Sequence, residues 1–133
     1  MTIDEVQQII SYAYPLIQSK IKSKFGNGKG PIPKIDTSHK NTYAMHSGEP
    51  EAEGEHAETS IAEYYKGVIY LYLPNIPNEE ELLRSIIHEY THYLQNITPL
   101  KTRIANQEYT YETNPYEIEA HKNEENWHLF SQK

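Results

Sequence analysis

The sequence predicts an α+β fold with an N-terminal helix, a small, mostly antiparallel sheet, a central helix and a C-terminal helix. Two observations predict it. Apolar residues recur every three or four positions near residues 3–24 and 79–97, as on one face of a helix. Between residues 68 and 73 the apolar side chains instead follow the period of two that is typical of a strand. A length of 133 residues is that of one domain with a modest core, so we expect a single domain over residues 1–133.

Composition argues against several classes of partner. The formal net charge of −7 argues against a general binder of nucleic acids or anionic membranes, which would need a basic face. The chain has no cysteine, which excludes disulfide bonds and thiolate metal ligands. Residues 1–10 show no signal-peptide pattern, and no apolar run is long enough to cross a bilayer. We therefore expect a cytoplasmic protein with no membrane or nucleic-acid partner.

The first predicted helix runs to about Lys24. Thr2 and Glu5 have the spacing of a capping box, in which each side chain bonds the backbone N–H of the other residue. The apolar positions that follow are Ile3, Val6, Ile10, Ala13, Ile17 and Ile21. Pro15 lies inside this pattern and should kink or split the helix, because proline has no N–H to donate.

Loops and short strands are expected after this helix. Residues 26–31 are rich in glycine and are interpreted as a linker, since no strand precedes them and no Gly-Lys-Ser/Thr follows, as a phosphate-binding loop would require. Residues 32–37 and 42–46 are each expected to form a short strand. The acidic residues 47–58 contain no large apolar side chain and should form a solvated loop. They lack the aspartate spacing of a calcium-binding EF-hand.

A β-hairpin is predicted from residues 60–64 and 68–73, joined by a tight turn at Lys66-Gly67. In its second strand the side facing the core would carry Ile69, Leu71 and Leu73, and the other side Val68, Tyr70 and Tyr72. If this strand lies at an edge of the sheet, its tyrosine face would border a cleft. Its backbone would then pair with an extended peptide.

The central predicted helix covers residues 78–96. Asn78 and Glu81 again have the spacing of a capping box, and Pro99 ends the helix. Its apolar stripe consists of Leu83, Ile87, Tyr90, Leu94 and Ile97. The face almost opposite this stripe carries two histidines, where an ordinary solvent face would more often carry lysine and glutamate.

These histidines, His88 and His92, form an H-E-x-x-H pattern with Glu89. Two imidazoles four positions apart on a helix can reach one metal ion, and the glutamate can then handle the proton of a metal-bound water. A zinc site of this kind needs a third protein ligand and leaves the fourth position for water. Two surface histidines with no metal are the alternative interpretation.

The last predicted helix, which begins after Asn114 as its N-cap, supplies candidates for the third ligand. Its apolar face consists of Tyr116, Ala120, Trp127 and Phe130. Glu119 flanks this face and is the favoured ligand. Glu117 is the alternative, less favoured because a capping-box glutamate is expected to bond its own helix terminus. His121 is a further candidate, but it is turned away from the apolar face.

The sequence HEYTHYLQ at residues 88–95 and PYEIEA at residues 115–120 resemble the paired signatures H-E-x-x-H-x-x-Q and P-x-E-x-E-A of small gluzincins, a group of zincin metallopeptidases. The similarity covers roughly residues 68–130, and the order of elements looks like a minimal zincin domain. The resemblance implies a zinc-dependent peptidase that acts on a peptide or protein substrate. In it, Zn²⁺ would be held by His88, His92 and Glu119, with Glu89 as the general base.

Further roles are expected for residues around these motifs. Tyr111, or alternatively Tyr109, precedes the last helix and would donate a hydrogen bond to the developing oxyanion. Gln95 or Glu112 would orient a metal ligand. The remaining histidines are expected to be exposed to solvent, namely His39, His46, His56 and His128. The alternative function is a catalytically silent module of zincin fold that binds a metal or a protein partner.

Overall fold

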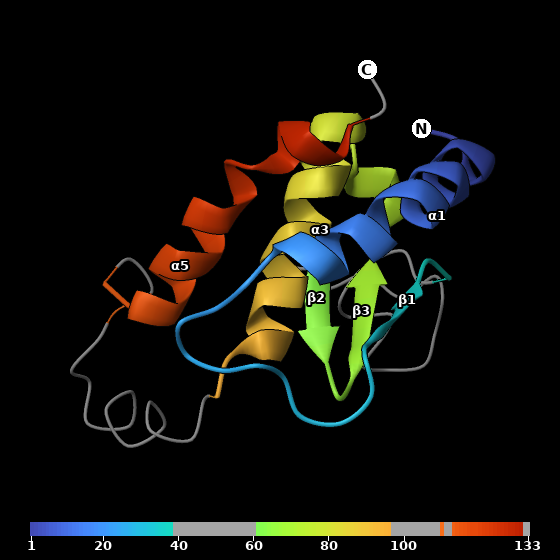
Figure 1. Ribbon diagram of the computed structural model, residues 1–133. Helices are drawn as coiled ribbons and strands as arrows, with labels where there is room; N and C mark the ends of the chain where they lie inside the picture. The colour runs from blue at the N-terminus through green and yellow to red at the C-terminus, as the bar shows by residue number, and fades with distance from the viewer. Residues whose placement is uncertain (39–60, 97–109, 111–112, 132–133) are drawn as a thin grey trace.

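The computed structural model describes residues 1–38, 61–96, 110 and 113–131. Its elements in chain order are α1 (Ile3–Lys20), β1 (Lys34–Asp36), β2 (Ala62–Tyr65), β3 (Val68–Leu71), the 3₁₀ helix η1 (Leu73–Asn75), α3 (Glu79–Leu94), α5 (Pro115–Glu124) and the 3₁₀ helix η2 (Trp127–Phe130). These elements form an α+β arrangement, as predicted (Figure 1). The predicted strand 42–46 and the acidic residues 47–58 lie outside the described residues.

The three described strands form a mixed sheet in the order β1-β3-β2. β2 and β3 are antiparallel and pair Tyr65 with Val68 next to their turn. In that turn Lys66 and Gly67 both have positive φ angles, 48° and 82°, as two-residue hairpin turns commonly require. The predicted hairpin is therefore confirmed.

β1 runs parallel to β3, so the prediction of a mostly antiparallel sheet is wrong for this pair. Parallel neighbours need a long crossover connection, and residues 37–67 between these strands are long enough to supply one. β3 is thus the central strand, with a partner on each side. The prediction that residues 68–73 form an edge strand for an extended peptide is therefore also wrong. Within the described sheet the edges are β1 and β2, and β2 contacts α3.

α1 begins with the predicted capping box. The Thr2 hydroxyl accepts the Glu5 N–H at 3.1 Å, and the Glu5 carboxylate accepts the Thr2 N–H at 2.9 Å. The helix ends at Lys20, about one turn earlier than expected. It continues through Pro15, so the predicted split does not occur. Pro15 and Ser11 are both exposed, so the Ser11 carbonyl that loses its usual partner lies on the solvent side.

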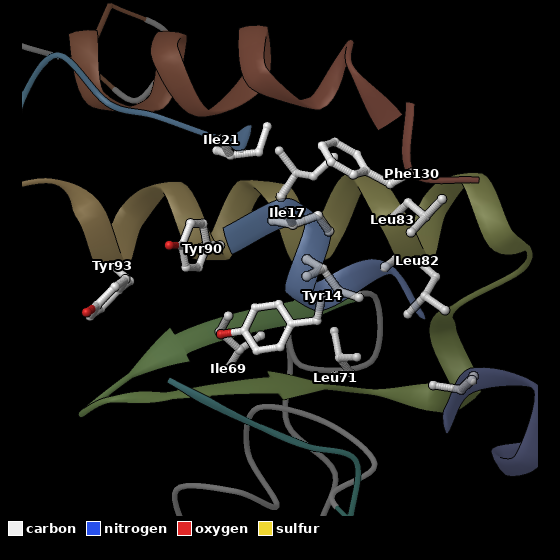
Figure 2. Close-up of a cluster of buried hydrophobic side chains, with 14 of the residues drawn as sticks. Tyr14, Ile17, Ile21, Ile69, Leu71, Leu82, Leu83, Tyr90, Tyr93 and Phe130 are labelled. Carbon is white, nitrogen blue, oxygen red and sulfur yellow. The ribbon is translucent and has the colours of Figure 1, made fainter. Parts of the chain in front are cut away.

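The core lies between α1, α3 and one face of the sheet (Figure 2). β3 turns its aliphatic side toward it, since Ile69 and Leu71 are fully buried, as predicted. The buried apolar side chains of α3 are Leu82, Leu83, Ile86, Ile87, Tyr90, Tyr93 and Leu94. Because this face is fixed in the core, the opposite face of α3 is turned toward α5, which packs on that side (Figure 1).

Residues 21–33 connect α1 to β1 and pass the C-terminal end of α3. The Asn96 N–H donates to the Phe25 carbonyl at 2.9 Å. The two backbones approach so closely that a Cβ on Gly26 would overlap the carbonyl oxygen of Leu94. The start of the glycine-rich stretch interpreted as a linker is thus a packed contact, and glycine is required at position 26 because no side chain fits.

Replacing Gly26 with alanine should lower the free energy of unfolding by about 1–3 kcal/mol, because the new methyl group must displace backbone atoms of α3. Gly30→Ala is the matched control, since Gly30 has a φ of +76° but open space around it. It should cost about 1 kcal/mol, from the left-handed backbone alone. Urea unfolding of both variants measures the difference, and equal losses would contradict the packed contact.

Candidate metal centre

The two histidines of α3 lie one turn apart on the face opposite the core. The Asn78 side chain caps this helix by accepting the Glu81 N–H at 2.9 Å. The Nε2 atoms of His88 and His92 lie 3.1 Å apart, with ring centroids separated by 4.7 Å. The spacing of four residues thus brings the two nitrogens close enough to bind one ion, as the helix geometry predicts.

Glu117 of α5 is the carboxylate that meets both histidines. Its Oε1 lies 2.8 Å from His92 Nε2, and its Oε2 lies 3.2 Å from His88 Nε2. The start of α5 is capped instead by the side chain of Asn114, which accepts the Tyr116 N–H at 2.9 Å. The expectation that Glu117 is occupied at its own helix terminus is therefore wrong.

Glu119, the ligand favoured from the sequence, lies on the other flank of α5. Its carboxylate accepts hydrogen bonds from the Ser23 hydroxyl at 2.5 Å, the Lys24 N–H at 2.9 Å and the Gln95 side-chain amide at 3.0 Å. These donors hold it against the segment that follows α1. The structure therefore does not bring Glu119 together with the two histidines, and Glu117, the stated alternative, occupies that place.

Gln95 fixes the orientation of the His92 ring. Its Nε2 donates to the Tyr116 carbonyl at 2.9 Å and to Glu119, so its Oε1 faces His92 Nδ1 at 2.7 Å. An amide oxygen only accepts, so Nδ1 of His92 must carry a hydrogen. A neutral His92 then has its lone pair on Nε2, the atom that faces His88 and Glu117. The contact expected for Gln95 is present.

Glu124 holds the other ring in the same way. Its Oε2 lies 2.6 Å from His88 Nδ1 and 3.0 Å from His121 Nδ1. A carboxylate behind an imidazole keeps the N–H on that side and leaves Nε2 for a metal. The sequence analysis missed Glu124. A signal existed, since Glu117, His121 and Glu124 follow one another at spacings of four and three, which places them on one helix face.

The charges of this cluster favour a cation among its groups. Burial lowers the pKa of His88, but the Glu117 and Glu124 carboxylates outweigh it and raise that pKa to about 10. Burial also lowers the pKa of His92, and Glu117 again outweighs it, so that this pKa is raised. For Glu117, burial raises the pKa, but the two histidines hold it well below its usual range. The carboxylates thus stabilise positive charge here, whether a proton or a metal ion carries it.

The residues present also fit a metal ion. Oε2 of Glu117 is buried and, although it lies 3.2 Å from His88 Nε2, makes no hydrogen bond of good geometry within the described residues. Two imidazole nitrogens and a carboxylate oxygen are a donor set that zinc accepts. Around a tetrahedral zinc ion with bonds of about 2.0 Å, neighbouring ligand atoms lie about 3.3 Å apart. Here the two imidazole nitrogens lie 3.1 Å apart, Oε1 of Glu117 lies 2.8 Å from His92 and Oε2 lies 3.2 Å from His88, so these four atoms have separations close to that spacing.

His121 offers a second possible grouping. One ligand atom from each of His88, Glu117 and His121 lies within 4.8 Å of the others, close enough to hold a metal ion. His121 is exposed, however, and its Nδ1 lies against Glu124. The group that contains His92 is more compact and less exposed, so the geometry favours it over the group that contains His121.

Glu89 lies beside the cluster, between α3 and β2. Its Oε2 accepts the Tyr64 N–H at 3.0 Å. Burial raises the pKa of Glu89, and the positive charge of the two histidines partly opposes this. A carboxylate with a raised pKa is suited to take up a proton and return it, as a general base must.

A cleft of about 740 Å³ opens beside these groups, and His92 and Glu117 form part of its wall. Its other lining residues are Phe25, Gly26, Asn27, Gly28, Lys29, Tyr64, Tyr93, Leu94, Gln95, Asn96, Asn114 and Tyr116. The volume is in the usual range for a small-molecule or peptide site. A molecule bound in this cleft would therefore reach two of the groups that could hold a metal.

The other predicted residues are placed as follows. Tyr109, Tyr111 and Glu112 lie outside the described residues. His128 is exposed, as expected. None of the helices in the described part of the chain combines the length and the apolar character of a membrane span.

No protein-family model, no curated protein and no solved structure matches this chain. The resemblance to gluzincins therefore rests on the two motifs and on the cluster that the structure forms from them.

Replacing Glu117 with glutamine should weaken Zn²⁺ binding by more than about 100-fold, because even residues behind metal ligands commonly account for 10–100-fold. Glu119→Gln is the matched variant, two positions away on the same helix, and should cost about 10-fold or less because its carboxylate does not reach the histidines. Competition with a chromophoric chelator measures both affinities. A larger loss of Zn²⁺ affinity for Glu119→Gln than for Glu117→Gln would contradict the assignment of Glu117 as a metal ligand.

Replacing Glu124 with glutamine should weaken Zn²⁺ binding by about 10–100-fold, because His88 loses the carboxylate that fixes its N–H. Glu125→Gln removes the same charge from the next, exposed position and should leave the affinity unchanged. The same competition assay applies. Equal effects of the two substitutions would show that only net charge matters.

Proposed function

We propose that this chain is a zinc-dependent peptidase in which His88, His92 and Glu117 hold the metal and Glu89 is the general base. The observation that supports it most is the convergence of two oriented imidazoles and a mostly buried carboxylate within 3.2 Å. The glutamate next to the first histidine adds the base that hydrolysis requires. Glu117 takes the place that the sequence motif suggested for Glu119.

The reaction would be the hydrolysis of a peptide bond. Zinc supplies a Lewis acid that lowers the pKa of water toward ~7 and polarises a carbonyl group. Glu89 would take a proton from water as the water oxygen bonds to the carbonyl carbon. It would then deliver that proton to the amine nitrogen as the C–N bond breaks. The Tyr64 N–H would limit rotation of the Glu89 carboxylate during these transfers.

Gln95 and Glu124 would act behind the ligands. Each accepts a hydrogen bond from Nδ1 of one histidine and so keeps Nε2 turned toward Glu117. This support strengthens the ligand and fixes its orientation. A hydrogen bond from Tyr111 or Tyr109 to the developing oxyanion remains a prediction of the sequence.

A metal-stabilised, catalytically silent module is the alternative. The three proposed ligands come from both α3 and α5, so a bound metal would also clamp the two helices together and its binding energy would stabilise the fold. A purely structural site has no need of a base beside it. The behaviour of Glu89 variants therefore distinguishes the two functions.

Glu89→Gln should retain zinc and lose peptide hydrolysis by at least about 100-fold, because the amide cannot accept the proton of water. His92→Ala should lose both zinc and hydrolysis. Metal content by mass spectrometry and cleavage of a fluorogenic peptide library measure the two properties on the same preparations.

Wild-type protein that binds no zinc when supplied with it would rule out both functions. The silent module would be favoured over the peptidase if wild-type protein and Glu89→Gln both bind zinc equally well and neither cleaves any library peptide.

A further inference from the structure

We infer that the cleft beside the metal ligands selects substrates with a large apolar side chain, aliphatic or aromatic, next to the bond that is cleaved. This specificity rests on the proposed peptidase function, because the cleft acquires its role from the ligands in its wall. His92 and Glu117 both line it, so a residue bound there would be an immediate neighbour of the reacting bond.

One wall of the cleft is an aromatic pair from the segment after α1 and from α5. The rings of Phe25 and Tyr116 are stacked, with centroids 4.3 Å apart and an angle of 29° between their planes. The Tyr116 hydroxyl donates to the Asn96 carbonyl. This hydrogen bond holds the buried Tyr116 ring in place, so Phe25, the partly exposed member of the pair, rests on a fixed support.

A second aromatic pair comes from β2 and α3. The rings of Tyr64 and Tyr93 meet edge to face, with centroids 6.2 Å apart. The Tyr93 hydroxyl donates to the Gly30 carbonyl at 3.0 Å. Gly28 lies so close to this ring that a Cβ there would come within 2.6 Å of it. The second wall is therefore also held rigidly.

The polar groups of the cleft do not favour a basic or a very small side chain. Among the described residues that line the cleft, the one charged side chain besides the two proposed metal ligands is Lys29. A substrate lysine or arginine would thus find no carboxylate beyond Glu117, which is already paired with the histidines. A substrate glycine would leave the exposed parts of Phe25 and Tyr64 facing water.

The expected size of the preference follows from apolar burial. Each methylene group removed from water favours binding by about fourfold. Rings that are already immobile lose little freedom when a side chain packs on them. A phenylalanine or leucine side chain should therefore be preferred over glycine by about 10–100-fold.

The test measures binding without catalysis. N-acetylphenylalaninamide, N-acetylglycinamide and N-acetyllysinamide are titrated by NMR into metal-free wild-type protein and into zinc-loaded Glu89→Gln protein. The phenylalanine compound should bind at least about 10-fold more tightly than the other two in both preparations, and it should shift the resonances of Tyr64 and Tyr93.

A pair of variants locates the site. Tyr64→Ala should reduce the preference for phenylalanine to a few-fold or less, because it removes one ring of the wall. Tyr65→Ala removes the next ring along β2, which is exposed and does not line the cleft, and should leave the preference unchanged. If Tyr64→Ala does not fold, the relative affinities of wild-type protein for the three compounds still test the proposed preference.

The outcomes separate this inference from the proposed function. Equal affinity for the phenylalanine and glycine compounds, or tighter binding of the lysine compound, would overturn the specificity even if zinc-dependent hydrolysis is found. A preference for phenylalanine in the metal-free protein would support the cleft as a selective site even if zinc binding fails. In a hydrolytic protein, kcat/KM for peptides with the same substitutions should follow the same order.

Discussion

The contact between Glu117 and the two histidines of α3 is the constraint on which the site depends. It links α3 to α5, so each helix must present one particular face to the other. α3 can do so because its opposite face is buried in the core against the sheet and α1. Two imidazole nitrogens and a carboxylate would not gather within 3.2 Å without positive charge among them. The fold therefore holds together a group that favours positive charge, carried by a proton or by a metal ion.

Hydrogen bonds connect the histidines of this cluster to the residues that line the cleft. From His92 a chain of hydrogen bonds runs through Gln95 to Glu119 and on to Ser23. Ser23 also accepts the N–H of Phe25, whose ring forms part of the cleft. The same interactions that orient a histidine thus also position a wall of the cleft. In the proposed peptidase, such shared support would keep the reacting groups and the substrate in a fixed relative position.

Features of the fold that depend on near neighbours in the chain were predictable. The capping box of Thr2 and Glu5 and the turn at Lys66-Gly67 each involve only residues within a few positions, and both form as expected. The apolar stripe of α3 is also found where its period places it. Because that stripe sets the rotation of the helix, the meeting of His88 and His92 on the opposite face was predictable as well.

The sequence alone thus determined α1, α3 and the start of α5, the buried face of α3 and the close approach of His88 and His92. It did not show that α5 ends at Glu124 and that Trp127–Phe130 forms a separate 3₁₀ helix. Tertiary structure decided the third member of the cluster and the order of the sheet. Glu117 and Glu119 flank the buried positions of α5 on opposite sides, and periodicity identifies the buried stripe without saying which flank faces α3. Likewise, no local pattern shows that β1 returns parallel to β3. Both outcomes depend on how elements distant in the chain pack, and the spacing of residues within one element carries no information about that.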